Sequence, residues 1–347
     1  MNRKWIWSLL TLAVAAAGAV TLYQTNQARQ RFVSGTTFAM NTFIDQKWFG
    51  PKGQKVYDGV VALISEIEQD ISMHIAGSEI DQLNQQAGKE YVKLSQRTFD
   101  LLKRAKELSG ASQDTFDLTV GPLVESWGIT GLTPKVPAQG EIDGDLELIC
   151  WEDLLLDETN CSAKLAREGM AVDLGGIAKG WVCDQIRQLA LEEGITSGYV
   201  SLGGNLMVIG EKPDGNEFNF GVRDPRGDAT QYIGVVHLEG KTMATTGDYE
   251  RYFEEDGVRY HHVLDPRTGY PADGGLISVS VISEDGALAD FLSTSLFVMG
   301  REETLKRMED DRYQLIVVDS DRNVYCSPGL KDNFVPNTKA VGYTFQS

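Results

Sequence analysis

The sequence predicts an α+β protein preceded by an N-terminal hydrophobic export segment. Apolar residues recur at helical spacing mainly in the first half, whereas short strands separated by glycine turns fill the second half. Residues 5–23 carry no charge and follow Arg3 and Lys4. With 347 residues and 42% hydrophobic content, the chain is long enough to bury a core as one large domain or two closely joined halves.

Residues 1–31 have the composition of a signal peptide or a signal anchor with a short polar linker. At about 1.5 Å per residue, the uncharged stretch 5–23 comes close to the roughly 30 Å of a bilayer core, and the preceding positive charges favour a cytoplasmic N-terminus. Ala17-Gly18-Ala19 offers a small-residue cleavage site. We expect a retained anchor rather than a cleaved signal, with residues 32–347 exported to the periplasmic side of the inner membrane.

The exported part is acidic. The chain has 32 basic and 50 acidic residues, a formal net charge of −18, and residues 1–35 contain four of the basic residues and no acid. Such a field makes nucleic acid a poor partner. A phosphorylated ligand would need a metal cation or well-placed lysines to offset the repulsion, which favours a divalent ion.

The four cysteines are scattered without C-x-x-C spacing, which argues against a zinc or redox site. Cys150 and Cys161 flank one acidic segment and are candidates for a disulfide in an oxidising compartment.

The predicted elements begin with a strand over 32–49 and amphipathic helices over 56–75 and 98–108. Turn and short helix follow over 117–129, and the acidic, turn-rich segment 139–167 is predicted to be peripheral. Strands are expected over 197–208, 218–223, 232–238, 258–264 and 276–281, then a helix over 287–299 and a closing hairpin over 315–318 and 324–326.

Residues 171–180, Ala-Val-Asp-Leu-Gly-Gly-Ile-Ala-Lys-Gly, are the most informative segment. A glycine pair permits a tight turn close to a ligand, and the following helix start directs N–H groups outward. Lys179 adds a positive charge suited to phosphate, and Asp173 is placed to accept from a sugar or ring donor. A packing turn between strand and helix is an equally good interpretation of this segment taken alone.

His261 and His262 are two of the four histidines in the chain, and they end an apolar strand before a turn rich in proline and glycine. We expect Arg267 and Thr268 in this turn to hold an anionic ligand near an imidazole whose pKa suits proton transfer. The alternative is a surface pair without function.

Asp290 and Thr294 are four residues apart and therefore share one face of an otherwise apolar helix. A hard cation such as Mg²⁺ would satisfy both if a backbone carbonyl and phosphate oxygens completed its shell. Alternatively, the threonine hydroxyl bonds back to its own helix and the aspartate serves the N-terminal turn.

Taken in this order, the segments resemble the FAD:protein FMN transferase family, often called ApbE, from about Gly35 to Pro328. The motifs that carry the resemblance are residues 173–180, 201–204, 245–249, 262–269 and 289–294. The resemblance implies a T-fold-like α+β architecture that binds FAD and Mg²⁺, or Mn²⁺ in its place. Such enzymes cleave the pyrophosphate of FAD, attach FMN through a phosphoester to a threonine or serine of an acceptor protein and release AMP.

The same resemblance implies site residues, position by position. Asp290, Thr294 and the carbonyl of Gly176 resemble metal ligands. The positions that resemble flavin-nucleotide contacts are Met40, His74, Thr115, Phe116, Asp117, Asp173, Lys179 and His262. We expect Lys179 to support the diphosphate and His262 to take the proton from the acceptor hydroxyl. These assignments require the helix that bears Asp290 to face the double-glycine turn.

Three positions depart from the family pattern. Asn41 stands where the family usually has glycine, so we expect the backbone to sit differently there. His74 stands where the family commonly has an aromatic residue, which changes stacking on the flavin or adenine, and Thr246 stands where serine is frequent.

The acceptors implied by the resemblance are flavin-carrying subunits of membrane electron-transport complexes of the NADH:quinone reductase or Rnf type. A membrane anchor would keep enzyme and acceptor on one surface. Two other functions are compatible with the sequence: an FAD pyrophosphatase, in which water replaces the protein hydroxyl, and a non-catalytic FAD-binding protein.

Overall fold

The computed structural model describes residues 28–228 and 230–346. The hydrophobic stretch expected to direct export lies outside these residues. Among the residues that are described, no helix combines the length and the apolar character needed to cross a bilayer.

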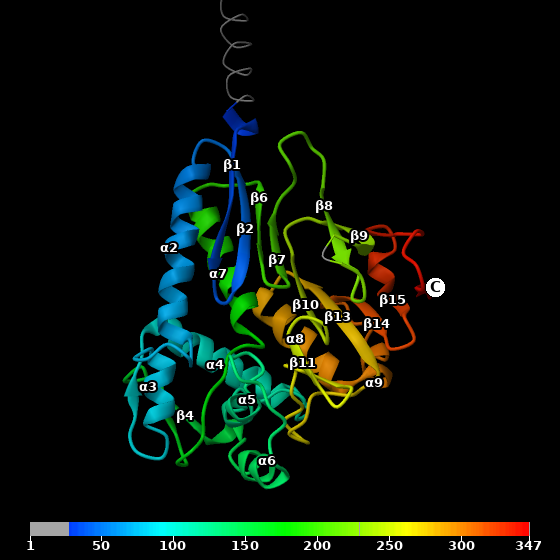
Figure 1. The fold of residues 1–347 in the computed structure, drawn as a ribbon. Coiled ribbons are helices and arrows are strands. Elements are labelled where there is room, and N and C mark those ends of the chain that lie inside the picture. Colours follow the sequence, from blue (N-terminus) through cyan, green and yellow to red (C-terminus); the bar gives the residue numbers. More distant parts are fainter. Residues whose placement is uncertain (1–27, 229, 347) are drawn as a thin grey trace, which may run out of the picture.

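A nine-stranded sheet forms the centre of the protein (Figure 1). Its strands pair antiparallel except for the parallel pair β15 and β17. In spatial order they are β1 (Phe32–Ala39), β2 (Thr42–Phe49), β6 (Gly198–Leu202), β7 (Asn205–Ile209), β10 (Thr242–Gly247), β13 (Leu276–Ser283), β14 (Gln314–Asp319), β15 (Asn323–Cys326) and β17 (Thr344–Phe345).

The two faces of this sheet are covered differently. Ala244, Val279 and Val317 face a core shared with helix α8 (Gly286–Met299). Their neighbours Met243 and Val318 face a second core shared with a small sheet of β8 (Phe218–Arg223), β9 (Tyr232–Leu238) and β16 (Phe334–Pro336). Because successive strand residues point to opposite faces, burial on both sides explains why β13 is apolar or small throughout and buried at every position.

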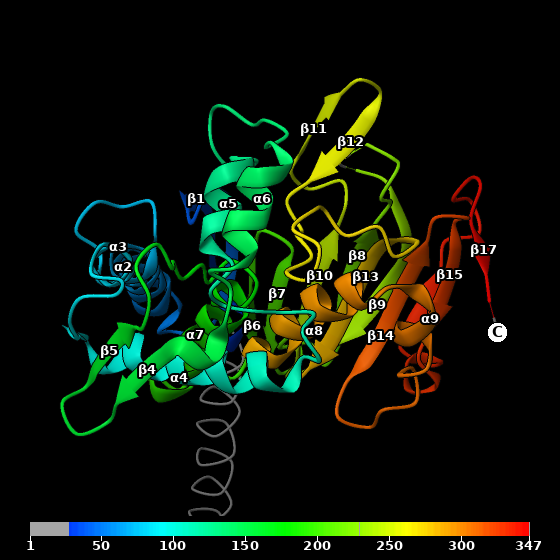
Figure 2. The ribbon, with the colours of Figure 1, turned by 90° about the horizontal axis from the view of Figure 1, so that it is seen from below.

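Helices α2 (Gly53–Ile71) and α7 (Ala178–Glu192) extend the helical layer beside α8 across the β1–β7 half of the sheet (Figure 2). The remaining elements complete the fold, and one of them, the 3₁₀ helix Pro328–Leu330, contributes Leu330 to the core on the opposite face of the sheet. They are α3 (Glu79–Gln85), β3 (Val92–Lys93), α4 (Gln96–Ala111), α5 (Gly121–Trp127), α6 (Gln139–Leu146), β4 (Leu154–Asp157), β5 (Ser162–Leu165), β11 (Tyr252–Glu255), β12 (Val258–His261), α9 (Arg301–Leu305) and the short 3₁₀ helices at Trp151–Asp153 and Pro328–Leu330.

Two predicted strands are hairpins. The stretch 32–49 reverses at Met40 and Asn41, whose φ angles of 49° and 56° place both residues in the left-handed region that a two-residue hairpin turn requires. The stretch 197–208 reverses at Gly203 and Gly204, with φ of 50° and 87°. The first turn contains no glycine, so the alternating pattern continues through it without a break.

Three further expectations need correction. The helix predicted to reach residue 75 ends at Ile71. The segment 139–167 is more ordered than a peripheral loop, because it contains α6, β4 and β5, and β5 pairs with β3. Cys150 and Cys161 are not joined by a disulfide, and all four cysteines, which lie among the described residues, are free.

Candidate active site

A cavity of about 890 Å³ opens where α7 begins, beside α8 and the turn between β1 and β2. Its volume is in the upper part of the range for small-molecule sites. Every site residue implied by the family resemblance lines it: Met40, His74, Thr115, Phe116, Asp117, Asp173, Gly176, Lys179, His262, Asp290 and Thr294. The sequence therefore identified one contiguous site from segments more than 200 residues apart.

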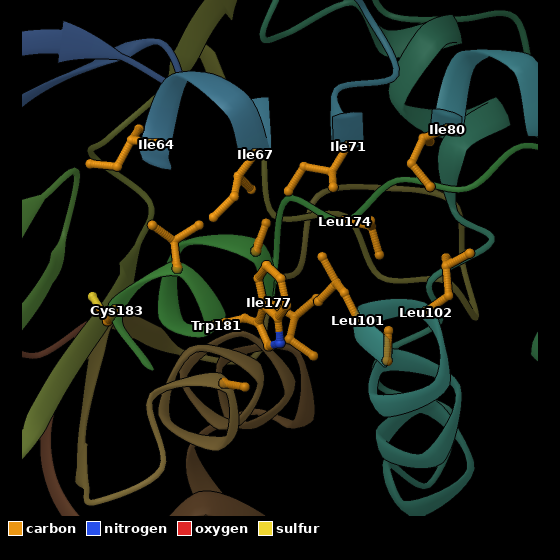
Figure 3. Packing of buried hydrophobic residues seen from close by; sticks show 14 of the residues in the cluster. Ile64, Ile67, Ile71, Ile80, Leu101, Leu102, Leu174, Ile177, Trp181 and Cys183 are labelled. Carbon is orange, nitrogen blue, oxygen red and sulfur yellow. The ribbon is translucent and has the colours of Figure 1, made fainter. Parts of the chain in front are cut away.

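The double-glycine turn is held on both sides. The amide N–H of Asp173 donates to the Leu118 carbonyl at 2.9 Å, and its side-chain Oδ1 accepts from the Gly175 N–H at 2.9 Å. Behind the turn, Leu174, Ile177 and Trp181 are buried in the core that α2 and α4 share (Figure 3). These apolar anchors leave the glycines of the turn facing the cavity.

Helices α7 and α8 touch through their backbones. A Cβ on Gly180 would lie 2.0 Å from the Gly286 carbonyl oxygen and 2.5 Å from the Asp290 Cβ. The Gly180 N–H donates to Asp290 Oδ2 at 2.8 Å. The helix that bears Asp290 therefore faces the double-glycine turn, as the site requires.

Several oxygen atoms gather at this crossing. The buried carboxylate of Asp290 also accepts from Asn205 Nδ2 at 3.2 Å through Oδ1. Thr294 Oγ1 lies 3.3 Å from Thr246 Oγ1, and a Cβ built on Gly176 would lie 3.3 Å from the same Thr294 oxygen. Gly176, Asp290 and Thr294 thus share one wall of the cavity.

The alternative roles considered for Asp290 and Thr294 are filled by their neighbours. Asp285 caps α8 by accepting from the Leu288 N–H at 2.8 Å, and Ser293 is the residue that donates back to its own helix, at the Asp290 carbonyl. The polar atoms of Asp290 and Thr294 are directed to groups outside α8.

The residues present fit a hard cation with few protein ligands. Within residues 28–228 and 230–346, no group of three or more His, Cys, Asp or Glu side chains is placed to hold a metal ion. Asp290 supplies one carboxylate, with two hydrogen bonds on its four lone-pair sites, and Thr294 and Gly176 add neutral oxygens. Mg²⁺ usually binds few protein carboxylates and completes its shell with phosphate and water.

His262 is a neutral base at the cavity wall. Burial first, and then the charges of Lys179 and Arg251, lower its pKa from 6.5 to about 3. Its Nδ1 lies 3.2 Å from the Arg251 carbonyl oxygen, which also accepts from the His262 amide at 3.0 Å. A carbonyl accepts only from a protonated nitrogen, so we assign the hydrogen to Nδ1, which leaves Nε2 as a proton acceptor.

His261, the neighbouring histidine, has a structural role. It is buried, its Nε2 lies 3.0 Å from the Ala272 carbonyl, and its ring meets Phe297 edge to face. Consecutive residues of a strand point to opposite sides, so one histidine of the pair enters the core and the other enters the cavity.

Lys179 and Asp173 bring opposite charges to the mouth of the turn. Lys179 lies in the first turn of α7, whose N-cap residue Ile177 makes no side-chain capping bond. Burial raises the pKa of Asp173, while the Gly175 N–H and then the charges of His74, Lys179 and Arg251 oppose that rise. The positive charge of Lys179 and the free N–H groups at the start of α7 together suit a phosphate ligand.

Thr115, Phe116 and Asp117 shape the cavity, but their polar side-chain atoms are occupied. Thr115 Oγ1 donates to the Ser112 carbonyl at 2.7 Å. Asp117 accepts from Thr119 and from the Trp151 N–H at 3.0 Å, and burial raises its pKa. Phe116 packs edge to face on Phe291 at 5.1 Å and lies against Gly176.

The turn between β1 and β2 is clamped from two sides. The Met40 N–H donates to Glu68 Oε1 at 2.8 Å, and Arg251 Nη2 donates to the Asn41 carbonyl at 3.1 Å. Asparagine is among the residues that tolerate a positive φ, so Asn41 keeps the turn where the family has glycine. His74 is exposed at the cavity edge.

One predicted anion site is wrong. Arg267 and Thr268 do not line the cavity. The Arg267 guanidinium forms a bidentate pair with Asp265 at 2.9 and 2.8 Å and also donates to the Val298 carbonyl. The arginine that does line the cavity is Arg251, which sequence reasoning missed, together with Glu68 on α2. The signal was available, because Arg251 lies two residues beyond the 245–249 motif.

Comparisons with known proteins agree on one family. The sequence matches the profile of the ApbE family over residues 35–317. An FAD:protein FMN transferase of Klebsiella pneumoniae (strain 342) is 37% identical over 280 residues, which cover 80% of this chain and 86% of that protein. One of Treponema pallidum (strain Nichols) is 32% identical over 287 residues, 79% of each chain.

Solved structures confirm the α+β fold. The crystal structure of the ApbE protein from Thermotoga maritima superposes with a TM-score of 0.82 at 34% identity and covers 87% of this chain and 99% of that chain. The flavin transferase ApbE from Vibrio cholerae has a TM-score of 0.78 at 28% identity, with the same coverage.

Proposed function

The chain belongs to the ApbE family, and on that premise we propose that it is an FAD:protein FMN transferase. The observation that carries the proposal is the convergence of three features in one cavity of about 890 Å³. These are the Asp290 carboxylate and the Thr294 hydroxyl beside Gly176, a lysine at a helix start, and a neutral histidine whose Nε2 is assigned as a proton acceptor.

The proposed reaction moves the FMN phosphoryl group from AMP to a hydroxyl. The hydroxyl oxygen of an acceptor threonine or serine attacks the FMN-side phosphorus of FAD, its proton passes to His262 Nε2, and the bond to the AMP oxygen breaks. Lys179 holds the diphosphate oxygens and stabilises the charge that grows on the departing AMP. A base that is neutral before the step can accept this proton without first losing one.

Asp290, Thr294 and the Gly176 carbonyl would hold the divalent cation, Mg²⁺ or Mn²⁺. When bound, the cation supplies positive charge that offsets the diphosphate. The acidic composition of the chain supports this assignment, since a diphosphate otherwise meets a repulsive field.

We also propose where the enzyme works and on what. The uncharged segment 5–23 after Arg3 and Lys4 supports export and anchoring on the periplasmic side of the inner membrane. Flavin-carrying subunits of membrane electron-transport complexes, of the NADH:quinone reductase or Rnf type, are the proposed acceptors. They present their hydroxyls at the same membrane surface.

Incubation of the protein with FAD, Mg²⁺ and a purified acceptor subunit tests the proposal. Mass spectrometry should show the acceptor heavier by one FMN phosphoryl unit, with AMP released in equal amount. Free FMN without an adduct would show a pyrophosphatase, and intact bound FAD would show a non-catalytic flavin-binding protein. An acceptor with the target threonine replaced by valine is the matched control.

A further inference from the structure

The cavity has few positive charges for a ligand that carries a diphosphate. Among the residues that the structure describes, two cationic side chains line it, Lys179 and Arg251. The acidic side chains that line it are Glu68, Asp117, Asp173, Glu250 and Asp290. Without Arg251, only Lys179 and the proposed divalent cation would offset this excess of negative charge. A second positively charged side chain would therefore favour the binding of a diphosphate.

The backbone of Arg251 is held by the segment before it. Asp248 forms a bidentate pair with Arg226 at 2.7 and 2.6 Å, and its N–H donates to the Ile277 carbonyl on β13 at 3.1 Å. Tyr249 packs against the core next to β8 and β9. The aspartate of the 245–249 motif thus serves to fix a loop, and Arg251 is the cationic residue that this loop presents to the cavity.

The side chain of Arg251 is only partly used. One of its five N–H donors bonds to the Asn41 carbonyl, and within the described part of the chain no other hydrogen bond or ion pair of the guanidinium is found. Its carbonyl holds His262. Arg251 therefore contacts the β1–β2 turn through its guanidinium and the proposed base through its carbonyl, and the guanidinium donors form a planar fork that matches phosphate oxygens.

We infer that Arg251 is a second diphosphate-binding residue, which with Lys179 binds the phosphates of FAD. This inference rests on the proposed function. The competing role for Arg251 is a purely structural clamp on the β1–β2 turn. If Arg251 binds phosphate, its positive charge raises the affinity for FAD, whereas a structural clamp does not depend on that charge.

FAD affinity of the full-length protein, measured by quenching of flavin fluorescence in chelator at several salt concentrations, tests the inference. Replacing Arg251 with glutamine should weaken FAD binding about tenfold or more, because charge-assisted hydrogen bonds are lost, and should flatten the dependence of affinity on salt. Arg251→Lys keeps the charge, so it should keep the salt dependence and lose less affinity. Arg259→Gln is the matched control, because Arg259 on β12 pairs with Glu254 and does not line the cavity.

Each result decides a different point. Unchanged FAD affinity in Arg251→Gln would overturn the inference and leave the transferase proposal standing. Equal losses in the glutamine and lysine variants, with the salt dependence of the wild type, would assign Arg251 to the turn and also overturn the inference. Absence of FAD binding by the wild-type protein both in chelator and with Mg²⁺ present would overturn the proposed function itself. If Arg251→Gln fails to fold, Arg251→Lys carries the comparison through its salt dependence.

Discussion

Two walls of the cavity are built by different means. The helix wall consists of residues 173–180 and helix α8, and it is fixed by direct backbone contact between Gly180 and Gly286. The loop wall consists of the β1–β2 turn, residues 247–251 and His262. It is fixed by polar contacts: Glu68 accepts from the Met40 N–H, Arg251 donates to the Asn41 carbonyl, the Arg251 carbonyl accepts from His262, and Asp248 pairs with Arg226.

The two walls differ in rigidity, and this difference indicates which part of the chemistry each wall serves. Close-packed helices hold the oxygens of Asp290 and Thr294 in one arrangement, which a metal site needs. The loop wall holds its members through few bonds, and such segments open more easily than a packed core. We infer that the helix wall sets the metal geometry and the loop wall adapts to nucleotide and acceptor.

Replacing Asp290 with asparagine should disable the proposed metal binding by the helix wall, and we expect this variant to have the largest effect. An amide offers no negative charge to a cation, so metal-dependent FMN transfer should fall by about 10³-fold or more. The rate of adduct formation and the affinity for Mn²⁺ would be measured together. Asp184→Asn is the control, because Asp184 accepts from the Gly286 and Ala287 amides at the same crossing but does not line the cavity. Equal metal affinity in the wild type and Asp290→Asn would remove this carboxylate from the site.

Replacing His262 with glutamine should break the loop wall chemically, with a loss in kcat of about 10²-fold, the usual contribution of a general base. The pKa of about 3 makes His262 neutral in the free enzyme, so kcat/KM should stay flat from pH 8 down to about pH 5 rather than fall near 6.5. A bound diphosphate stabilises the charged imidazole, so the acid limb should appear at higher pH in kcat than in kcat/KM. The same acid limb in His262→Gln would assign it to another group.

The sequence predicted the helix wall better than the loop wall, for a physical reason. The glycine pair and the i, i+4 spacing of Asp290 and Thr294 are local patterns, and local patterns are visible in one sequence. The loop wall depends on contacts between residues 41 and 251, which no local pattern records. The prediction therefore chose Arg267, which lies in the turn that follows the histidine pair, although Asp265 occupies it.

The hairpin at 40–41 shows the same limit. Alternation predicted extended chain correctly there, but it does not mark where a strand reverses when the turn residues are Met40 and Asn41 rather than glycine. The resemblance located every predicted site residue on the cavity, since it carries long-range information that periodicity lacks.

Replacing Gly180 with alanine should disrupt the helix wall through a steric clash alone, without removing a functional group. The new Cβ would lie 2.0 Å from the Gly286 carbonyl, so α7 and α8 must separate, at a cost of about 3 kcal/mol in the free energy of unfolding. Urea unfolding checks this value. Gly144→Ala in α6, where nothing lies within 4 Å, should be neutral or stabilising by about 0.5 kcal/mol. A Gly180→Ala protein as stable as the wild type would show that the helices can adjust, and the wall would not be rigid.

Replacing Asn41 with glycine should have the smallest effect of these variants. It tests whether the loop wall uses the carbonyl or the side chain of residue 41. The loop wall uses the Asn41 carbonyl, not its side chain, and both residues accept a φ of 56°. The free energy of unfolding should therefore change by less than about 0.5 kcal/mol, and FAD affinity should be kept. Asn41→Val is the contrasting variant, since a β-branched residue at this φ should cost about 1–2 kcal/mol and displace the carbonyl that Arg251 holds. A loss of FAD affinity in Asn41→Gly would mean that the asparagine side chain itself contacts the ligand. Residue 41 of the loop wall would then bind FAD through its side chain, just as the helix wall is proposed to hold the metal through side chains.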